Sequence, residues 1–163
     1  MPTVARKLRI QFRKYLEKGY VRNAQLDPRI PPEVAQLAEA NESFIVRVDR
    51  VGWQPPWPGA TARAAQGGRF WFSDHRVLLE DESVHELFRY ESVRECYWMF
   101  KDLPDRINAD PGLGKDMKRN YGDRLEIDLG DRICVLDGLG QAYSPVLHFF
   151  HWMLRETLTE PAQ

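Results

Sequence analysis

The sequence predicts an α+β domain with two helices near the N-terminus, about seven short antiparallel strands in consecutive hairpins, and one C-terminal helix. Two changes in hydrophobic period support this prediction. Apolar residues recur at helical spacing over residues 4–16, whereas from Ser43 onward they alternate with polar residues, as in half-buried strands. Near the C-terminus the i, i+3, i+4, i+7 spacing of a helix returns over residues 146–158.

Length and composition favour one globular unit. The chain has 163 residues, of which 43% are hydrophobic and 29% charged, and a core of this size needs no disulfide or metal. No apolar run is long enough for a signal peptide or a membrane span. Cys96 and Cys134 lie in apolar runs without a C-x-x-C spacing. We therefore predict a cytoplasmic protein with two reduced, buried thiols, whose separation the sequence leaves open.

The N-terminal segment is basic and amphipathic. Residues 1–22 contain seven basic residues and one acidic residue, Glu17, although the whole chain carries a net charge of −1. On a helical wheel the basic residues lie away from the apolar stripe, and Ile10 is stranded among them. The stripe consists of Val4, Leu8, Phe12, Tyr15 and Leu16. A second helix is predicted from about Pro32 to Ala40, so residues 1–42 form a predicted basic helical extension.

The strands follow in order, separated by two irregular segments. Three prolines interrupt residues 53–68, and residues 101–121 are polar and rich in glycine and proline, so both segments are predicted to be loops. Alternating or continuous apolar runs bounded by turn residues predict the strands. They cover residues 43–51, 69–72, 76–80, 84–90, 93–100, 125–129 and 133–136. The run at 93–100 fits a buried helix equally well.

Two segments resemble the pleckstrin-homology-like superfamily, particularly its GRAM and bacterial members. Residues 68–79 are similar to its pattern of glycine, apolar strand, polar turn, arginine and apolar strand, and residues 86–93 to the next strand. Over residues 43–158 the resemblance implies a seven-stranded antiparallel bent sheet, or partly open barrel, capped by the C-terminal helix, in a domain of residues 43–160. Lipid-binding members use a basic cluster near the first two strands, where this chain has Arg47, Arg50, Arg63 and Arg69.

Trp53 and Trp57 and the prolines between them suit recognition of a protein or peptide, with Arg63 and Arg69 nearby. Equally, both indoles can fold back to cover the open side of the sheet. We predict a partner-binding surface at these four residues.

The basic face of the N-terminal helix is the second candidate surface. Arg6, Arg9, Arg13, Lys14 and Lys18 can bind an anionic membrane surface. The plainer interpretation is that the helix packs on its own domain and its cations are merely solvated. Nucleic-acid binding is a third interpretation, although no recognition motif accompanies the charge.

The sequence gives no catalytic, cofactor or metal site. His148 and His151 have an i, i+3 spacing, but zinc needs three or four ligands, so they are interpreted as surface histidines. Ser73, Asp74 and His75 are adjacent and cannot form a nucleophile–base chain. The leading hypothesis is a non-enzymatic binding or scaffolding module for a protein or peptide, with peripheral association to an anionic membrane through the basic helix. The alternatives are a small enzyme with a site from His75, His85 and the 101–121 loop, and nucleic-acid binding.

Overall fold

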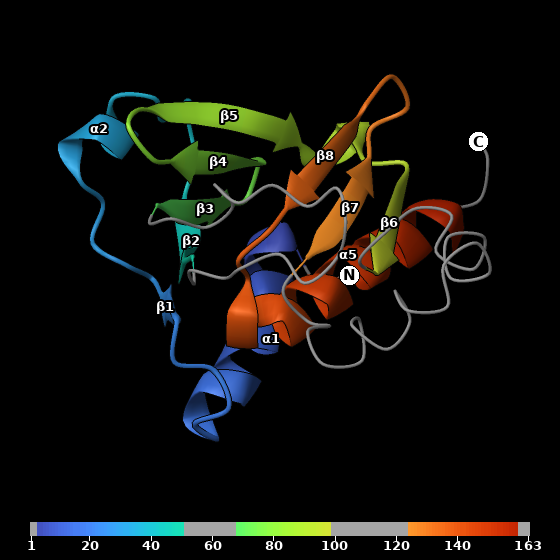
Figure 1. Ribbon diagram of the computed structural model, residues 1–163, viewed down its shortest axis with the longest axis horizontal. Coiled ribbons are helices and arrows are strands. Elements are labelled where there is room, and N and C mark those ends of the chain that lie inside the picture. The colour runs from blue at the N-terminus through green and yellow to red at the C-terminus, as the bar shows by residue number, and fades with distance from the viewer. Residues whose placement is uncertain (1–2, 51–67, 99–123, 160–163) are drawn as a thin grey trace, which may run out of the picture.

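The computed structural model describes residues 3–50, 68–98 and 124–159; residues 1–2, 51–67, 99–123 and 160–163 lie outside this description. Within the described residues, eight strands form two antiparallel sheets accompanied by three α-helices (Figure 1). In chain order the elements are α1 Val4–Glu17, β1 Ala24–Leu26, α2 Pro32–Ala35, β2 Phe44–Asp49, β3 Arg69–Ser73, β4 Arg76–Glu80, β5 Val84–Arg89, η1 Tyr90–Ser92, β6 Glu95–Trp98, β7 Leu125–Asp128, β8 Ile133–Leu136, η2 Gly140–Ala142 and α5 Tyr143–Thr159.

The strands divide between sheet A, with order β1-β2-β3-β4-β5, and sheet B, with order β6-β7-β8. Neighbours within each sheet are antiparallel, and the β3–β4 and β4–β5 hairpins keep consecutive strands together. The chain leaves sheet A at the 3₁₀ turn η1, where Val93 N–H donates to Tyr90 carbonyl, and then enters β6 of sheet B. Strands β5 and β6 are consecutive but do not pair.

The prediction of a single seven-stranded sheet is therefore wrong. A single bent sheet or partly open barrel of seven strands was expected, but the described residues form eight strands in two sheets, of five and three strands, with no closed barrel. Two features account for the error. The turn η1 ends the run of consecutive hairpins, and the three residues of β1 are too few to show a strand period. The second helix is also shorter than predicted, because α2 ends at Ala35.

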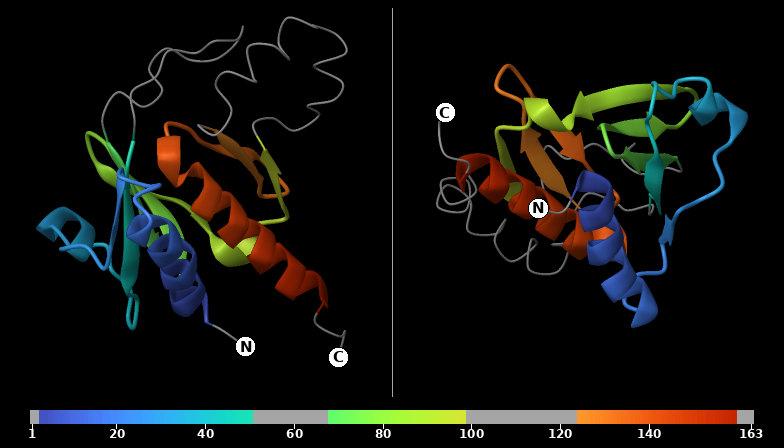
Figure 2. Two further views of the ribbon diagram at one scale, coloured as in Figure 1. Left: turned by 90° about the horizontal axis from the view of Figure 1, so that it is seen from below. Right: turned by 180° about the vertical axis from the view of Figure 1, so that it is seen from behind.

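The main core lies between the two sheets and the helices α1 and α5. These helices lie side by side, and α1 contacts β2 whereas α5 contacts β6 (Figure 2). Each presents the apolar stripe that its sequence period predicts. The fully buried side chains of this core include Leu8, Phe12, Phe70, Phe72, Ile127, Phe149 and Phe150.

Sheet A is also covered on its other face. Because side chains alternate along a strand, Trp71 points away from Phe70 and Phe72 into a second, smaller cluster. This cluster consists of Val34 from α2, Phe44, Trp71 and Leu78, and the Trp71 indole donates to Glu80 Oε1 at 2.9 Å. Residues of the predicted N-terminal extension thus contribute to both cores.

Cys96 and Cys134 are separate, free and buried thiols, as expected. Each is the cross-strand partner of Ile127 of β7, so they lie two strands, or about 9.5 Å, apart, beyond disulfide reach. Burial raises the pKa of Cys96 to about 12 and that of Cys134 to about 11, which makes both poor nucleophiles. Within the described part of the chain, no helix combines the length and apolar character that a membrane crossing requires.

Candidate functional site

The β3–β4 hairpin turn is held by one hydroxyl. Ser73 is fully buried, and its Oγ accepts hydrogen bonds from the backbone N–H of His75 and Arg76, both at 2.9 Å. The same hydroxyl donates to Glu42 Oε2 at 2.6 Å. The turn is therefore fixed from within and tied to the segment that precedes β2.

Arg76 and Glu42 form a buried ion pair beside this turn. Arg76 Nε and Nη2 lie 3.0 Å from the two oxygens of Glu42, whose side chain is fully buried. Asn41 has a left-handed backbone with φ of 63°, a conformation that asparagine tolerates and that directs the chain into Glu42. Arg76 also donates to Glu86 at 3.1 Å and to the carbonyl of Leu37. The pair thus fastens residues 37–42 to the hairpin.

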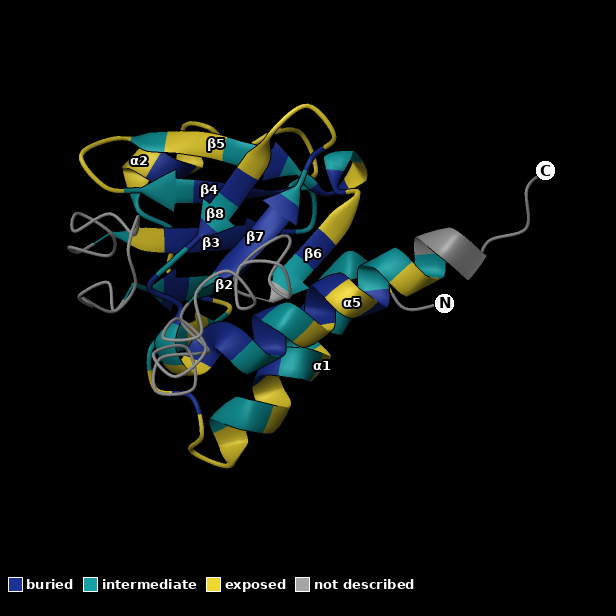
Figure 3. Ribbon diagram, turned by 45° about the vertical axis from the view of Figure 1, so that its right-hand side comes forward, coloured by how far each residue is buried: buried dark blue, intermediate teal, exposed yellow. Residues whose placement is uncertain are grey.

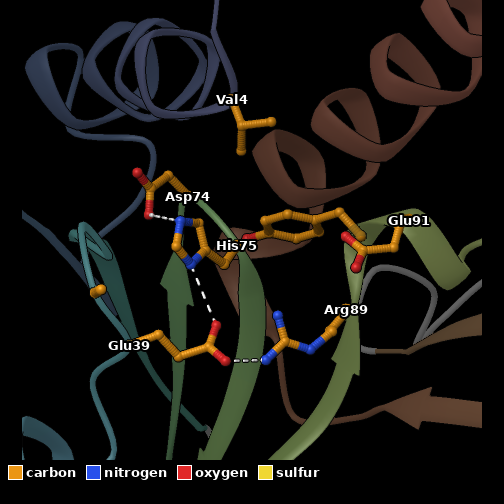
Figure 4. A pocket seen from close by; sticks show the side chains of 8 residues that line it. Val4, Glu39, Asp74, His75, Arg89 and Glu91 are labelled. Carbon is orange, nitrogen blue, oxygen red and sulfur yellow. Dashed lines mark hydrogen bonds and ion pairs between the residues drawn. The ribbon is translucent and has the colours of Figure 1, made fainter.

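A cavity of about 540 Å³ opens next to this pair, and His75 lies on its wall (Figure 4). His75 Nδ1 is 3.3 Å from Glu39 Oε1, and its Nε2 is 3.7 Å from Asp74 Oδ1. Glu39 is also paired with Arg89. The first residue of α1, Val4, borders the same cavity, together with Tyr90 and Glu91.

The two glutamates are held ionised. The hydrogen bond from Arg89 is the largest influence on Glu39 and, with His75 and Arg76, lowers its pKa to about 2. Burial opposes ionisation of Glu42, but the hydrogen bonds from Arg76 and Ser73 outweigh it and leave the pKa of Glu42 below its usual 4.5. Buried Tyr90 keeps its proton, because burial raises its pKa, and it donates to Ser73 carbonyl at 2.7 Å.

These carboxylates are expected to make the protein acid-sensitive. A folded-state pKa below the unfolded value stabilises the fold fully above about pH 4.5, and this contribution is lost as the pH falls toward about 2. Urea unfolding midpoints across this range should fall steeply for the wild type and less steeply for Glu39→Gln. The exposed-turn variant Glu82→Gln serves as the control. Identical slopes for Glu39→Gln and the control would contradict the expectation.

The cluster has the residue types of a metal site, but its electrostatics favour ion pairing. Glu39, Glu42 and His75 offer ligand atoms within 4.8 Å of one another. However, Arg76 and Arg89 already bond to these carboxylates, so two positive charges lie next to the oxygens that would bind a cation. We therefore interpret the cluster as an ion-pair network that holds the fold together.

Ser73, His75 and His85 do not form a hydrolytic catalytic site in the described part of the chain. The Ser73 hydroxyl donates to Glu42, and its hydrogen bond with His75 comes from the backbone N–H and not from the imidazole. His85 is the cross-strand partner of Leu79, whereas His75 precedes Arg76, so the two histidines lie at opposite ends of β4, about 13 Å apart along the strand. The structure therefore does not bring His75 and His85 together. The 101–121 loop of that hypothesis lies outside the described residues.

Of the predicted partner-binding residues, Trp53, Trp57 and Arg63 lie outside the described residues. Arg69 lies on β3, with Nε 3.3 Å from Asp49 and Nη1 3.7 Å from Glu80. Because two carboxylates share this guanidinium, its charge is largely compensated. Recognition of a protein or peptide at these residues stays a prediction.

The predicted anionic-surface residues lie along α1. Arg6, Arg13, Lys14 and Lys18 are exposed, and within the described part of the chain no carboxylate forms an ion pair with them. Figure 3 shows that α1 carries both buried and exposed positions along its length. Arg9 differs, because its Nη2 is 2.8 Å from Asp27 Oδ1. Ile10, stranded among the cations in the sequence, is 45% exposed on this face. The α1 outer face, meaning Arg6, Ile10, Arg13, Lys14 and Lys18, is thus cationic with one apolar side chain.

The packing of α1 against α5 brings lysines of α1 close to basic and aromatic side chains of α5. The sequence alone did not predict this association. Lys7 Nζ lies 5.5 Å from the ring centre of Trp152 on α5. Burial and then the positive charges of His151, Lys14 and Arg155 lower the pKa of His148. The helical wheel places His148, His151 and Arg155 together, but only the tertiary contact brings Lys14 to them.

None of the known family models, curated proteins or solved structures compared with this chain matches it.

Proposed function

We propose that this protein is a binding module that associates with an anionic membrane surface through the α1 outer face. The observation that carries the proposal is the division of α1 into two sides. Leu8 and Phe12 are fully buried in the core, so the helix is fixed in place and its cations are directed outward. Cations that are already in position lose less conformational freedom on binding.

This arrangement specifies an electrostatic mode of binding. An interfacial helix normally inserts its apolar face into the lipid, but here the core of the protein holds that face. Each Lys or Arg near an anionic surface contributes about 1 kcal/mol and is screened beyond about 8–10 Å at physiological salt. Ile10 adds a small apolar contact at the centre of the face, and Tyr20, 62% exposed, follows the end of the helix.

A membrane suits this face better than nucleic acid does. Exposed Ile10 gains nothing from contact with a phosphate backbone, whereas the headgroup region accommodates both apolar and aromatic side chains. The α1 outer face is also short for following the phosphates of a nucleic acid, because α1 has only 14 residues.

Co-sedimentation with phosphatidylcholine vesicles, with and without phosphatidylglycerol, tests the proposal. Arg6→Gln/Arg13→Gln should weaken binding to the anionic vesicles roughly thirtyfold, since two cations contribute about 2 kcal/mol. The matched variant Arg29→Gln/Arg94→Gln removes two exposed arginines elsewhere and should bind like the wild type. Binding should also weaken with salt. Failure to bind anionic vesicles, or an equal loss of vesicle affinity in both variants, would refute the proposal. Binding to a DNA duplex but not to vesicles would identify nucleic acid as the partner of the α1 outer face.

A further inference from the structure

A second cavity lies along α5 and shares no lining residue with the cavity at His75. It has a volume of about 340 Å³ and is lined by β6 and α5 through Glu95, His148, His151, Leu154 and Arg155. The helices α1 and α5 are in contact and lie side by side (Figure 2). The charge of Lys14 on α1 acts on His148, which lines this α5 cavity.

We infer that the α5 cavity binds the phosphate monoester headgroup of a membrane lipid, with His148, His151 and Arg155 as its hydrogen-bond donors. The inference rests on the proposed membrane association for the source of the phosphate. The capacity of the cavity to hold a phosphate does not depend on it.

The donors share one side of a helix. Positions 148, 151 and 155 follow i, i+3, i+7 spacing, which places their side chains in one row along α5. A guanidinium presents a planar fork of N–H groups to phosphate oxygens, and a protonated imidazole donates from both ring nitrogens. Leu154 supplies an apolar wall, which suits the glycerol part of a headgroup.

The groups around His148 are mostly basic, which favours binding of an anion. Besides His148, the charged and titratable groups that line the cavity are Glu95 of β6 and His151 and Arg155 of α5, and Lys14 of α1 acts on His148 through its charge. Three of these four carry or can gain positive charge. Burial lowers the pKa of His148, and repulsion by these positive groups lowers it further, so neutral His148 is favoured while no anion is present. A bound phosphate would relieve this repulsion, so binding and proton uptake are coupled and each strengthens the other.

The coupling predicts a particular pH profile. An ordinary histidine gains its proton near pH 6.5; the lowered pKa of His148 delays this in the free protein, and a bound phosphate favours it. A phosphate monoester loses its second charge below about pH 6. Affinity should therefore rise as the pH falls from about 8 to about 6 and should decline again below that. A phosphodiester headgroup has no second charge to lose and should show no such decline.

Titration of the full-length protein with glycerol 3-phosphate, followed by NMR of the histidine side chains, tests the cavity without a membrane. The pKa of His148 should rise on saturation, and the side-chain resonances of His151 should shift with it, whereas those of exposed His85 on β5 should not change. Glu95 is the only carboxylate among the described residues that line the cavity, so Glu95→Gln should tighten binding about two- to fivefold. An unchanged pKa of His148 at about 10 mM ligand, or weaker binding by Glu95→Gln, would overturn the inference.

Vesicles then identify the source of the phosphate. At matched surface charge, the protein should prefer phosphatidic acid over phosphatidylglycerol by at least about fivefold. His148→Gln/His151→Gln should lose this preference yet keep its binding to phosphatidylglycerol, and His85→Gln should keep both. A histidine response to glycerol 3-phosphate without binding to either vesicle would refute the membrane proposal alone. Binding to both vesicles without preference would overturn the lipid assignment.

Discussion

Replacing Glu42 by glutamine is expected to destabilise the protein by about 3 kcal/mol. Removing one member of a buried ion pair leaves the other charge without compensation, and such changes cost about 3–5 kcal/mol. Arg76 keeps Glu86, which is partly exposed, so the lower end of the range applies. Urea unfolding at neutral pH measures the loss.

Two further variants separate the ion pair from a general effect of losing charge. Glu33→Gln removes an exposed carboxylate from α2 and should change the free energy of unfolding by less than about 0.5 kcal/mol. Glu42→Leu/Arg76→Met removes both charges and should be less destabilising than Glu42→Gln, because no buried charge is then left unpaired. A loss below about 1 kcal/mol in Glu42→Gln would mean that water solvates this pair.

The sequence gives no sign that Glu42 is buried. It lies in the polar run Asn41-Glu42-Ser43, which is typical of an exposed turn. Its burial depends on Arg76 and Ser73, more than thirty positions away, and no local pattern records that contact. The pattern around residues 73–76 predicted the turn but not the network that fixes it. The association of Lys14 with His148 escaped prediction for the same reason.

The helices whose burial is one-sided could be predicted, because the stripe of α1 and the apolar side of α5 each have a period that matches their geometry. The hairpin from β3 to β4 was predicted from two apolar runs on either side of a polar turn. The division of the strands between two sheets could not be predicted, because β5 and β6 are consecutive and both strand-like. Only residues 90–94, which include the 3₁₀ turn η1, separate them. β3 shows a further limit, since cores on both of its faces remove the alternation that marks a strand.

Replacing Phe12 by alanine is expected to destabilise the protein by about 3–5 kcal/mol, the usual loss for a large aromatic removed from a core. Phe12 is fully buried, and its ring centre lies 6.5 Å from that of Phe72 on β3. Thermal or urea unfolding measures this change. Ile10→Ala is the matched control on the same helix, and because Ile10 is 45% exposed it should change stability by less than about 0.5 kcal/mol.

The same pair of variants decides how α1 meets a membrane. If the helix stays in the core, Ile10→Ala weakens vesicle binding slightly, whereas folded Phe12→Ala binds as the wild type does. If α1 instead left the core and inserted its apolar stripe into lipid, Phe12→Ala would lose much of its membrane affinity while costing the fold little. Full burial of Leu8 and Phe12 favours the first outcome, because withdrawing both side chains from the core would cost more than two exposed cations contribute at a surface. On this account the α1 outer face binds as a fixed part of the domain.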